Sequence, residues 1–276
     1  MFKNFAKRIT TLACLIGSIS LVNAQQLTIK GSDTVLPLSQ KLAEVYLKKN
    51  SDKVISVVGG GSGVGIASLI DGLTEIAQAS RSIKKKEIKK AQKKGVEPKE
   101  IVVGRDALTA IINPNNPVTQ LTLSQMSDIF TGRVTNWKDV GGKDLEIVVY
   151  SRESSSGTYS FFKKAVMNNA EYSVNALLMP ATGAIVQSVS QTEGAIGYIG
   201  FAYLTDSVKP VNVGTKDGKF VTPTAQTAAN GTYPITRNLY YYTNGEPTGN
   251  AKHFIDFALS DEGQELVKKV GYIKVK

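Results

Sequence analysis

The sequence is poor in the residues on which most metal sites and catalytic triads depend. Its 276 residues include one cysteine and one histidine. Cys14 lies in an N-terminal segment that we expect to be removed, and His253 lies in a predicted C-terminal helix, where we expect a structural or surface role. Zinc sites combine several Cys or His ligands, and acyl-transfer triads need a histidine base. The composition therefore predicts no metal site and no disulfide in the mature protein.

The common cofactor and hydrolase motifs are also missing. The glycine-rich segment 59–65 lacks the Lys-Ser/Thr ending of a nucleotide-binding P-loop, and its glycines do not have the dinucleotide-binding spacing. There is no Gly-x-Ser-x-Gly elbow, and the Ser-x-x-Lys matches at Ser82 and Ser160 have no Lys-Thr-Gly partner. We therefore predict a protein that uses no cofactor and is not an enzyme.

The first 24 residues are typical of a signal peptide. Lys3, Lys7 and Arg8 form a basic start, an apolar stretch follows over 9–22, and Ala24 ends a small-residue cleavage site. Lipidation at Cys14 is an alternative, which Thr11 disfavours because such signals usually have Leu there. We expect cleavage near Ala24 and a mature protein in the periplasm or on the outer side of the inner membrane.

Positive charge exceeds negative charge. The chain carries 33 basic and 23 acidic residues, and removal of three basic groups with the first 24 residues lowers the net charge from +10 to +7. Much of the excess lies in Lys84–Lys94, which we interpret mainly as a solvated helix face. An adhesive or surface-interaction role for this face is an alternative. An exported protein seldom meets nucleic acid, so no nucleic-acid partner is expected, whereas a positive field would help capture a small anion.

One local pattern occurs three times: a β-rich run, a turn of small residues and an amphipathic helix. The strands are expected at 27–30, 54–58 and 147–150, and the turns at 31–34, 59–63 and 151–158. Strands separated by helices indicate parallel sheets that are covered by helices. Ligands bind such sheets at the carboxyl ends of strands, in the loops that lead into helices. All three turns occupy that position.

Other segments extend this α/β pattern. Strands are expected at 101–103, 108–112, 195–199 and 238–242, and helices at 123–130, from Ile185, at 253–259 and at 261–270, the last with a capping box between Asp261 and Gln264. We expect two lobes, with the chain crossing between them near 105–109 and returning near 235–240. The C-terminal helices should pack on the first lobe.

The three turns have the chemistry of an oxyanion site. A helix start leaves backbone N–H groups unpaired, and these groups combine with Ser or Thr hydroxyls to hold a tetrahedral anion. Arg152 in the third turn adds a guanidinium, which pairs with oxyanions in bidentate fashion. A purely structural alternative, in which the turns only cap helices, stays open from the local pattern.

Six segments carry a resemblance to a known family: GSDTVLPLSQKLAEVY at 31–46, GGGSGVGIASLIDG at 59–72, IAQASRSI at 76–83, IFTGRVTNWKDVGG at 129–142, SRESSSGTYSFF at 151–162 and QTEGAIGYIGFAYL at 191–204. Through them the chain resembles the PstS family, the phosphate-binding component of the phosphate ABC transporter. The resemblance implies a two-lobe type II periplasmic binding fold, with mixed sheets, helices on both faces and a ligand cleft between the lobes. The expected lobes are 25–107 plus 236–276, and 108–235.

The resemblance also implies the ligand contacts. The residues expected to bind phosphate are Ser32, Thr34, Val35, Ser62, Ser80, Arg81, Arg152, Ser156, Gly157 and Thr158. Thr34 would offer its hydroxyl and N–H, and Val35 its N–H. Ser62 would cap its helix and hold a phosphate oxygen, and Arg152 would form the charged pair with the anion.

One segment departs from the family pattern. Family members often have Ser-Asp after a strand, where the carboxylate accepts the proton of the phosphate, and this chain has Ser80-Arg81. Arginine cannot accept a hydrogen bond. Asp33 is the nearest carboxylate for that role, but a role as an N-cap or in stabilising the fold is an equal alternative. The acceptor matters because monohydrogen phosphate has a proton to donate and sulfate has none.

The sequence thus predicts an exported, monomeric solute-binding protein that captures inorganic phosphate and delivers it to the membrane permease of an ABC transporter. An alternative within the same class is a protein for another tetrahedral oxyanion: sulfate, molybdate or tungstate. A secreted phosphate-ester hydrolase is a further alternative, which the missing metal cluster and base disfavour.

Overall fold

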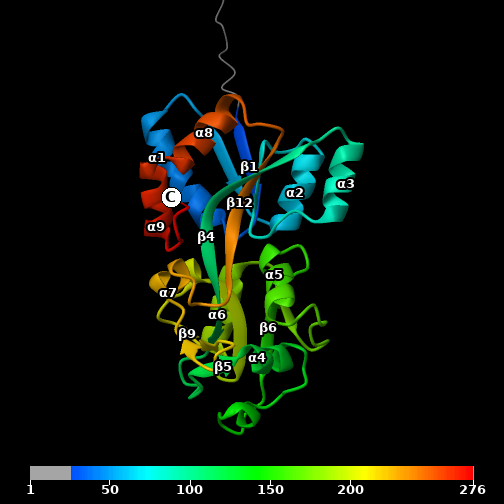
Figure 1. Cartoon of the computed structure of the whole chain (residues 1–276), viewed down its shortest axis with the longest axis vertical. Coiled ribbons are helices and arrows are strands. Elements are labelled where there is room, and N and C mark those ends of the chain that lie inside the picture. The colour runs from blue at the N-terminus through cyan, green and yellow to red at the C-terminus, as the bar shows by residue number, and fades with distance from the viewer. Residues whose placement is uncertain (1–25, 276) are drawn as a thin grey trace, which may run out of the picture.

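The computed structural model describes residues 26–275, which form two lobes joined by two long strands (Figure 1). The predicted signal peptide, the cleavage site at Ala24 and Cys14 lie outside the described residues. Within 26–275, no helix has both the length and the apolar character needed to cross a bilayer.

The upper lobe of Figure 1 has a mixed sheet between two layers of helices. Its strands are β1 (Leu27–Gly31), β2 (Ile55–Val58), β3 (Ile76–Ala79), the first part of β4 (Pro98–Ile112) and β12 (Thr236–Asn244). Its helices are α1 (Leu36–Lys49), α2 (Ser62–Ile70), α3 (Lys85–Lys93), α8 (Gly249–Leu259) and α9 (Asp261–Val270). Alternate residues of β12 reach the two sides: Leu239 and Tyr241 pack with α1, α8 and α9, and Tyr240 and Tyr242 pack with α2.

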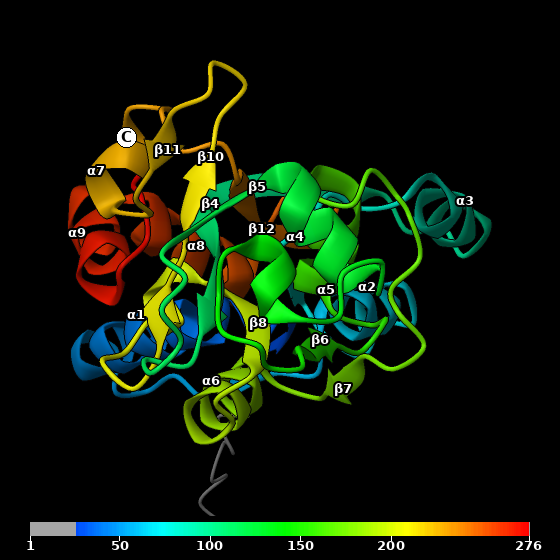
Figure 2. The ribbon, with the colours of Figure 1, turned by 90° about the horizontal axis from the view of Figure 1, so that it is seen from below.

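The lower lobe continues the same sheet and adds a small one (Figure 2). Its strands are β5 (Gln120–Thr122), β6 (Val148–Arg152), β7 (Leu177–Met179), β8 (Ala195–Gly200), β9 (Lys209–Pro210), β10 (Asn212–Gly214) and β11 (Phe220–Val221). Its helices are α4 (Leu123–Phe130), α5 (Gly157–Ala165), α6 (Thr182–Gln191) and α7 (Ala225–Ala229), with 3-10 turns at Trp137–Val140 and Phe201–Tyr203. Phe162 stacks on Tyr198, with ring centroids 4.2 Å apart, inside the larger core of this lobe.

One strand, β4, belongs to both lobes. The sequence predicts separate strands at 101–103 and 108–112, but both belong to β4, which runs without a break from 98 to 112. β4 pairs antiparallel with β12 through Ala107 and with β8 from Leu108 onward. The continuous main sheet has the order β2-β1-β3-β12-β4-β8-β6-β7. The carboxyl ends of β1, β2 and β3 therefore face the lower lobe, and that of β6 faces the upper lobe.

Most predicted helices form where the apolar pattern places them. The helix predicted at 123–130 coincides with α4, and α8 and α9 pack on α1 as expected. The predicted capping box at Asp261 and Gln264 is wrong: Ser260 caps α9 through Gly263 N–H, and the Gln264 side chain donates to Val103 O and Ala258 O. Because Gln264 is buried, its side-chain amide pairs with carbonyl groups that the fold brings close. These partners cannot be predicted from the neighbouring sequence.

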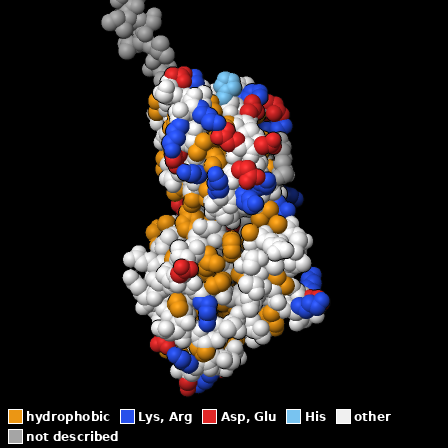
Figure 3. Space-filling view, turned by 90° about the vertical axis from the view of Figure 1, so that its left-hand side faces the viewer, with side chains coloured by type: hydrophobic (Ala, Val, Ile, Leu, Met, Phe, Trp, Pro, Cys, Tyr) orange, Lys and Arg blue, Asp and Glu red, His pale blue; other side chains and the backbone are white. Residues whose placement is uncertain are grey.

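The excess positive charge belongs to one lobe. Residues 25–107 and 236–276 contain 21 basic and 14 acidic residues, whereas 108–235 contains nine of each. Figure 3 shows charged side chains gathered over the upper lobe and few over the lower lobe on the side it presents. The net positive charge of residues 25–276 therefore comes from the upper lobe.

Candidate functional site

Hydroxyl groups from three turns of the upper lobe meet where the lobes touch. Ser32 follows β1, Ser62 begins α2, and Ser80 follows β3. Ser32 Oγ donates to Ser80 Oγ at 3.0 Å, and Ser62 Oγ lies 3.4 Å from Ser80 Oγ and accepts from Ser80 N–H at 3.0 Å. All three side chains are buried. Ser62 is the first residue of α2 and makes no cap, so its predicted capping role is wrong.

The lower lobe contributes the start of α5 to the same place. Ser156 caps α5 by accepting from the N–H groups of Thr158 and Tyr159, which fixes the turn after β6. Thr158 Oγ1 lies 2.8 Å from Thr34 Oγ1 of the upper lobe. Gly63 N–H donates across the interface to Ser155 O at 2.9 Å. The hydroxyl cluster, which we define as Ser32, Thr34, Ser62, Ser80, Ser156 and Thr158, therefore spans both lobes.

The backbone of Gly157 packs closely against two hydroxyls of the upper lobe. A Cβ atom there would lie 2.3 Å from Ser62 Oγ and 2.5 Å from Ser80 Oγ. Only glycine allows the N-terminus of α5 to reach these two hydroxyls.

The loop after β1 is held by groups from several segments. Tyr203 donates its hydroxyl to Asp33 O at 2.6 Å, and the Tyr272 hydroxyl donates to Thr34 O. The Val35 N–H donates to Ser32 O at 3.1 Å within the same turn. The Val35 N–H is therefore engaged within its own turn, and its predicted contact with a ligand stays a prediction. Thr34 and Asp33 of this turn both contact the lower lobe.

Arg152 and Asp33 form a buried ion pair between the lobes. Arg152 Nη2 lies 2.7 Å from Asp33 Oδ2, and the Arg152 and Asp33 side chains are 2% and 11% exposed. The guanidinium also donates to Met179 O, Pro180 O and Thr182 Oγ1, in the turn from β7 to α6. Asp33 Oδ1 accepts from Gly60 N–H. Asp33 thus joins three segments and is not the N-cap of α1, which is Val35.

Arg81 is held by Glu87 at the start of α3. Its two terminal nitrogens contact the Glu87 carboxylate at 2.8 and 2.7 Å, and Lys84 N–H donates to the same carboxylate. Burial alone would raise the pKa of Glu87, but the hydrogen bonds and charges of Arg81 and Lys84 lower the pKa overall, below the usual 4.5. The ionised carboxylate is therefore the form that the fold favours.

We expect the Glu87→Gln substitution to destabilise the protein at pH 7 by about 2 kcal/mol, because it removes a charge-assisted pair and leaves Arg81 buried without a counter-charge. A lowered carboxylate pKa adds stability above about pH 4.5, and that stability is lost as the pH falls through the folded-state pKa. The difference in unfolding free energy between wild type and variant should therefore shrink below pH 4.5. Denaturant titrations at pH 7, 5 and 3.5 measure this, with the exposed-pair variant Glu265→Gln as the control.

Arg237 is a site residue that sequence reasoning missed. It lies on β12 opposite Asp106 of β4, and its Nε and Nη2 atoms donate to Asp106 Oδ2 at 3.1 and 2.8 Å. Nη2 also reaches Thr158 Oγ1 at 3.1 Å and Thr34 Oγ1 at 3.4 Å. The Arg237 guanidinium, which β12 carries, thus contacts hydroxyls of both lobes within the hydroxyl cluster. The sequence signal for it was weak, because β4 also carries Lys99, Glu100 and Arg105, so Arg237 and Asp106 do not stand out as a pair.

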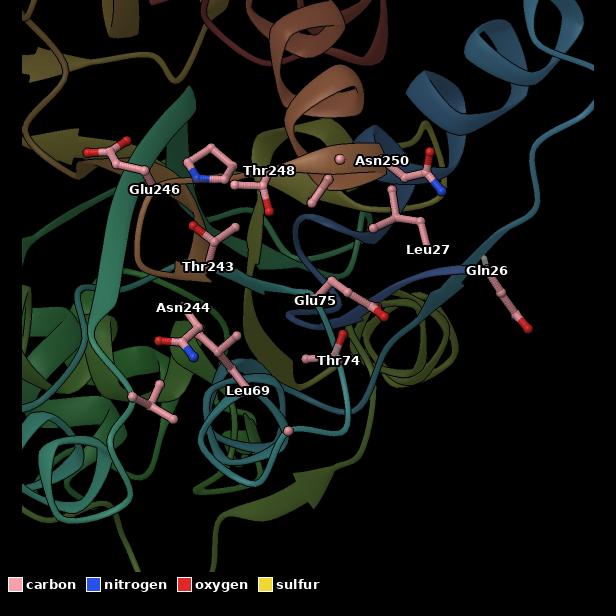
Figure 4. Close-up of a pocket in the computed structure, with 15 residues that line it drawn as sticks. Gln26, Leu27, Leu69, Thr74, Glu75, Thr243, Asn244, Glu246, Thr248 and Asn250 are labelled. Carbon is pink, nitrogen blue, oxygen red and sulfur yellow. The ribbon is translucent and has the colours of Figure 1, made fainter. Parts of the chain in front are cut away.

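A separate hollow of about 350 Å³ lies at the far end of the upper lobe (Figure 4). Thr74, Glu75, Thr243, Glu246 and Thr248 are among its lining residues. Its lining contains no Lys, Arg or His, so it lacks the positive charge that an anion site needs. Among the described residues, no group of three or more His, Cys, Asp or Glu is placed to hold a metal ion.

The fold and the interlobe cluster define a solute-binding protein of the two-lobe, type II periplasmic class. Residues 18–262 match the family model for the PBP superfamily domain. The PstS phosphate-binding protein of Staphylococcus saprophyticus is 38% identical over 243 residues, which cover 85% of this chain and 76% of that protein. The PstS protein of Bacillus subtilis is 35% identical over 253 residues, covering 90% and 80%. This chain belongs to the PstS family of phosphate-binding proteins.

Solved structures agree with this assignment. A chain from Clostridium perfringens, assigned as a phosphate ABC transporter substrate-binding protein and solved with bound phosphate, is 41% identical with a TM-score of 0.84, covering 91% of this chain and 100% of that one. An ABC-type phosphate transport receptor from Vibrio cholerae is 30% identical with a TM-score of 0.72, covering 90% and 99%. The predicted fold class, a mixed α/β sheet with helices on both faces, is confirmed.

Proposed function

We propose that the chain captures inorganic phosphate between its lobes and delivers it to the permease of an ABC transporter. The observation that carries the proposal is the convergence of buried hydroxyls from four turns and both lobes on one place, bordered by Arg152 and Arg237. Short O–H and N–H hydrogen bonds in a dry cleft are the interactions that hold a tetrahedral dianion. The names of the PstS relatives support phosphate as that anion.

Phosphate rather than another oxyanion is proposed on the basis of Asp33. Its Oδ1 accepts one backbone N–H, at 3.1 Å, and keeps a lone pair for a further donor. Monohydrogen phosphate can supply that donor, whereas sulfate, molybdate and tungstate dianions would meet a carboxylate to which they cannot donate. Asp33 would thus take the acceptor role that Arg81 cannot.

The lobes are proposed to be 25–107 plus 236–276 and 108–235, closing about β4 and β12. The switch of β4 from β12 to β8 between Ala107 and Leu108 supports this boundary. We further propose that the mature protein starts near Gln25, acts as a monomer outside the cytoplasmic membrane and has no catalytic activity. Ligand-driven closure would present both lobe surfaces to the permease together.

A thermal-shift titration tests the choice of anion. At a phosphate concentration about 100 times Kd, binding adds about 2.7 kcal/mol, so Tm should rise by roughly 5–10 °C. Sulfate at the same concentration and ionic strength should leave Tm nearly unchanged. The Asp33→Asn variant should narrow the gap between the two anions. Equal stabilisation of the wild type by sulfate would identify a general oxyanion-binding protein instead.

A further inference from the structure

A groove of about 740 Å³ opens beside the hydroxyl cluster, where three parts of the chain meet. Residues 81–84 line it from the upper lobe, residues 159–165 of α5 line it from the lower lobe, and residues 237–240 of β12 form its back. Lys84 Nζ reaches across it to Ser160 Oγ at 3.4 Å. We call this space the interlobe groove.

The interlobe groove is positively charged. Arg81, Lys84, Lys163, Lys164 and Arg237 line it, and no Asp or Glu is among its lining residues. The two arginines are paired with carboxylates that lie outside the lining, and Lys163 is paired with Glu171. Lys84 and Lys164 make no ion pair within the part of the chain that the structure describes. Burial and the nearby charge of Arg81 lower the pKa of Lys84, and the opposing effect of the Glu87 carboxylate does not cancel them.

Two arginines that line the groove each have one buried N–H group without a hydrogen-bond partner. Arg81 Nε and Arg237 Nη1 make no hydrogen bond, and their residues are 8% and 6% exposed. A buried donor left without a partner costs about 1–3 kcal/mol. Both belong to guanidinium groups, whose preferred partners are oxyanions. The groove therefore combines uncompensated charge with unused donors.

The groove leads to the hydroxyl cluster. Arg237 lines the groove and also donates to Thr158 Oγ1 and Thr34 Oγ1. On the upper side, Arg81 Nη2 would lie 3.6 Å from a Cβ at Gly63, beside the contact between Gly63 and Ser155. An anion in the groove would thus be separated from the cluster by the Arg237 side chain, which borders both.

We propose that the interlobe groove is an outer anion-binding site, which captures a phosphate dianion and passes it to the hydroxyl cluster. The inference rests on the proposed function and adds a capture step to it. Lys84 and Lys164 supply the attraction, and the unused N–H groups of Arg81 and Arg237 supply hydrogen bonds. A charged cleft with low-dielectric walls raises the local concentration and the association rate of an oppositely charged ligand, and salt weakens this effect.

Stopped-flow measurement of phosphate association, at low and at physiological ionic strength, tests the proposal. In the double variant Lys84→Gln/Lys164→Gln the association rate constant at low salt should fall about tenfold and depend less on salt, with the dissociation rate constant within about twofold of wild type. The matched control Lys89→Gln/Lys93→Gln removes the same charge from the part of α3 outside the groove and should keep a rate close to wild type. Lys164→Gln alone, on an exposed side chain, should give part of the effect without risk to folding.

The outcomes separate the two proposals. An association rate equal to that of wild type in the groove variant, or an equal loss in the control, would overturn the outer site while leaving phosphate binding intact. Absence of phosphate binding by the wild-type protein would overturn the proposed function and the outer site together. A selective loss of association rate in the groove variants supports both.

Discussion

Replacing Arg152 by methionine is expected to weaken phosphate binding by at least about 100-fold. Loss of one partner of a buried, hydrogen-bonded charge pair typically costs 2–5 kcal/mol in binding. Two effects add here. The cleft loses a positive charge, and Asp33 becomes an uncompensated carboxylate beside an incoming dianion. Asp33 and Arg152 lie in different lobes, so opening of the lobes returns Asp33 to water. The substitution therefore destabilises mainly the closed form, and its free-energy cost lowers the binding affinity. Isothermal titration calorimetry measures the change.

Two further variants show whether the effect belongs to this pair. Arg133→Met removes the same charge from an exposed pair with Asp128 in the same lobe and should leave the affinity near that of wild type. Arg152→Lys keeps the charge but loses the planar fork that contacts Asp33, Pro180 and Thr182, so it should give an intermediate affinity. If the Arg152→Met variant binds phosphate with an affinity within about threefold of wild type, Arg152 does not take part in binding.

The Gly157→Ala substitution should reduce phosphate affinity by about 30-fold, with little change in thermal stability of the ligand-free protein. The new methyl group would lie within 2.5 Å of two hydroxyl oxygens and 3.1 Å from Ser62 Cβ, so the lobes would have to stop short of their present contact. Overpacking of this kind costs about 1–3 kcal/mol. The open form relieves the clash, because the atoms concerned belong to different lobes.

Gly183→Ala provides the matched control, since a Cβ at that position in α6 would meet no atom within 4 Å apart from its chain neighbours and the nearby backbone of its own helix. It should bind phosphate as the wild type does. Small-angle scattering with and without phosphate would add a direct readout of closure: the Gly157→Ala protein should contract less than the control. Equal contraction and equal affinity in both variants would show that the lobes do not close through the contact between Gly157 and Ser62.

The parts of the site that follow local rules were predictable. Turns of Ser, Gly and Thr between a β-rich run and an amphipathic helix placed Thr34, Ser62 and the start of α5 at the carboxyl ends of strands. The helix predicted at 123–130 follows from apolar spacing alone. These features depend only on a few neighbouring residues, so they can be predicted from the local sequence.

The parts that depend on tertiary pairing were not predictable. Arg237 reaches the cluster because β12 pairs with β4, over 130 residues away in sequence, where Asp106 lies opposite. The groups that surround Arg152 come from the turn between β7 and α6, which has no strong local signal: β7 is a short edge strand with two exposed leucines. The role of Asp33 likewise stayed open until its partner Arg152 was placed.

A crystal structure of the protein grown with phosphate would show where the anion binds. We expect a tetrahedral anion between the lobes, in contact with residues 32–34, 62, 80 and 156–158 and with Arg152 or Arg237 within hydrogen-bonding distance. The same cleft should stay free of sulfate when sulfate replaces phosphate at equal concentration. The absence of phosphate from this cluster, or sulfate bound in the same position, would contradict the proposed function.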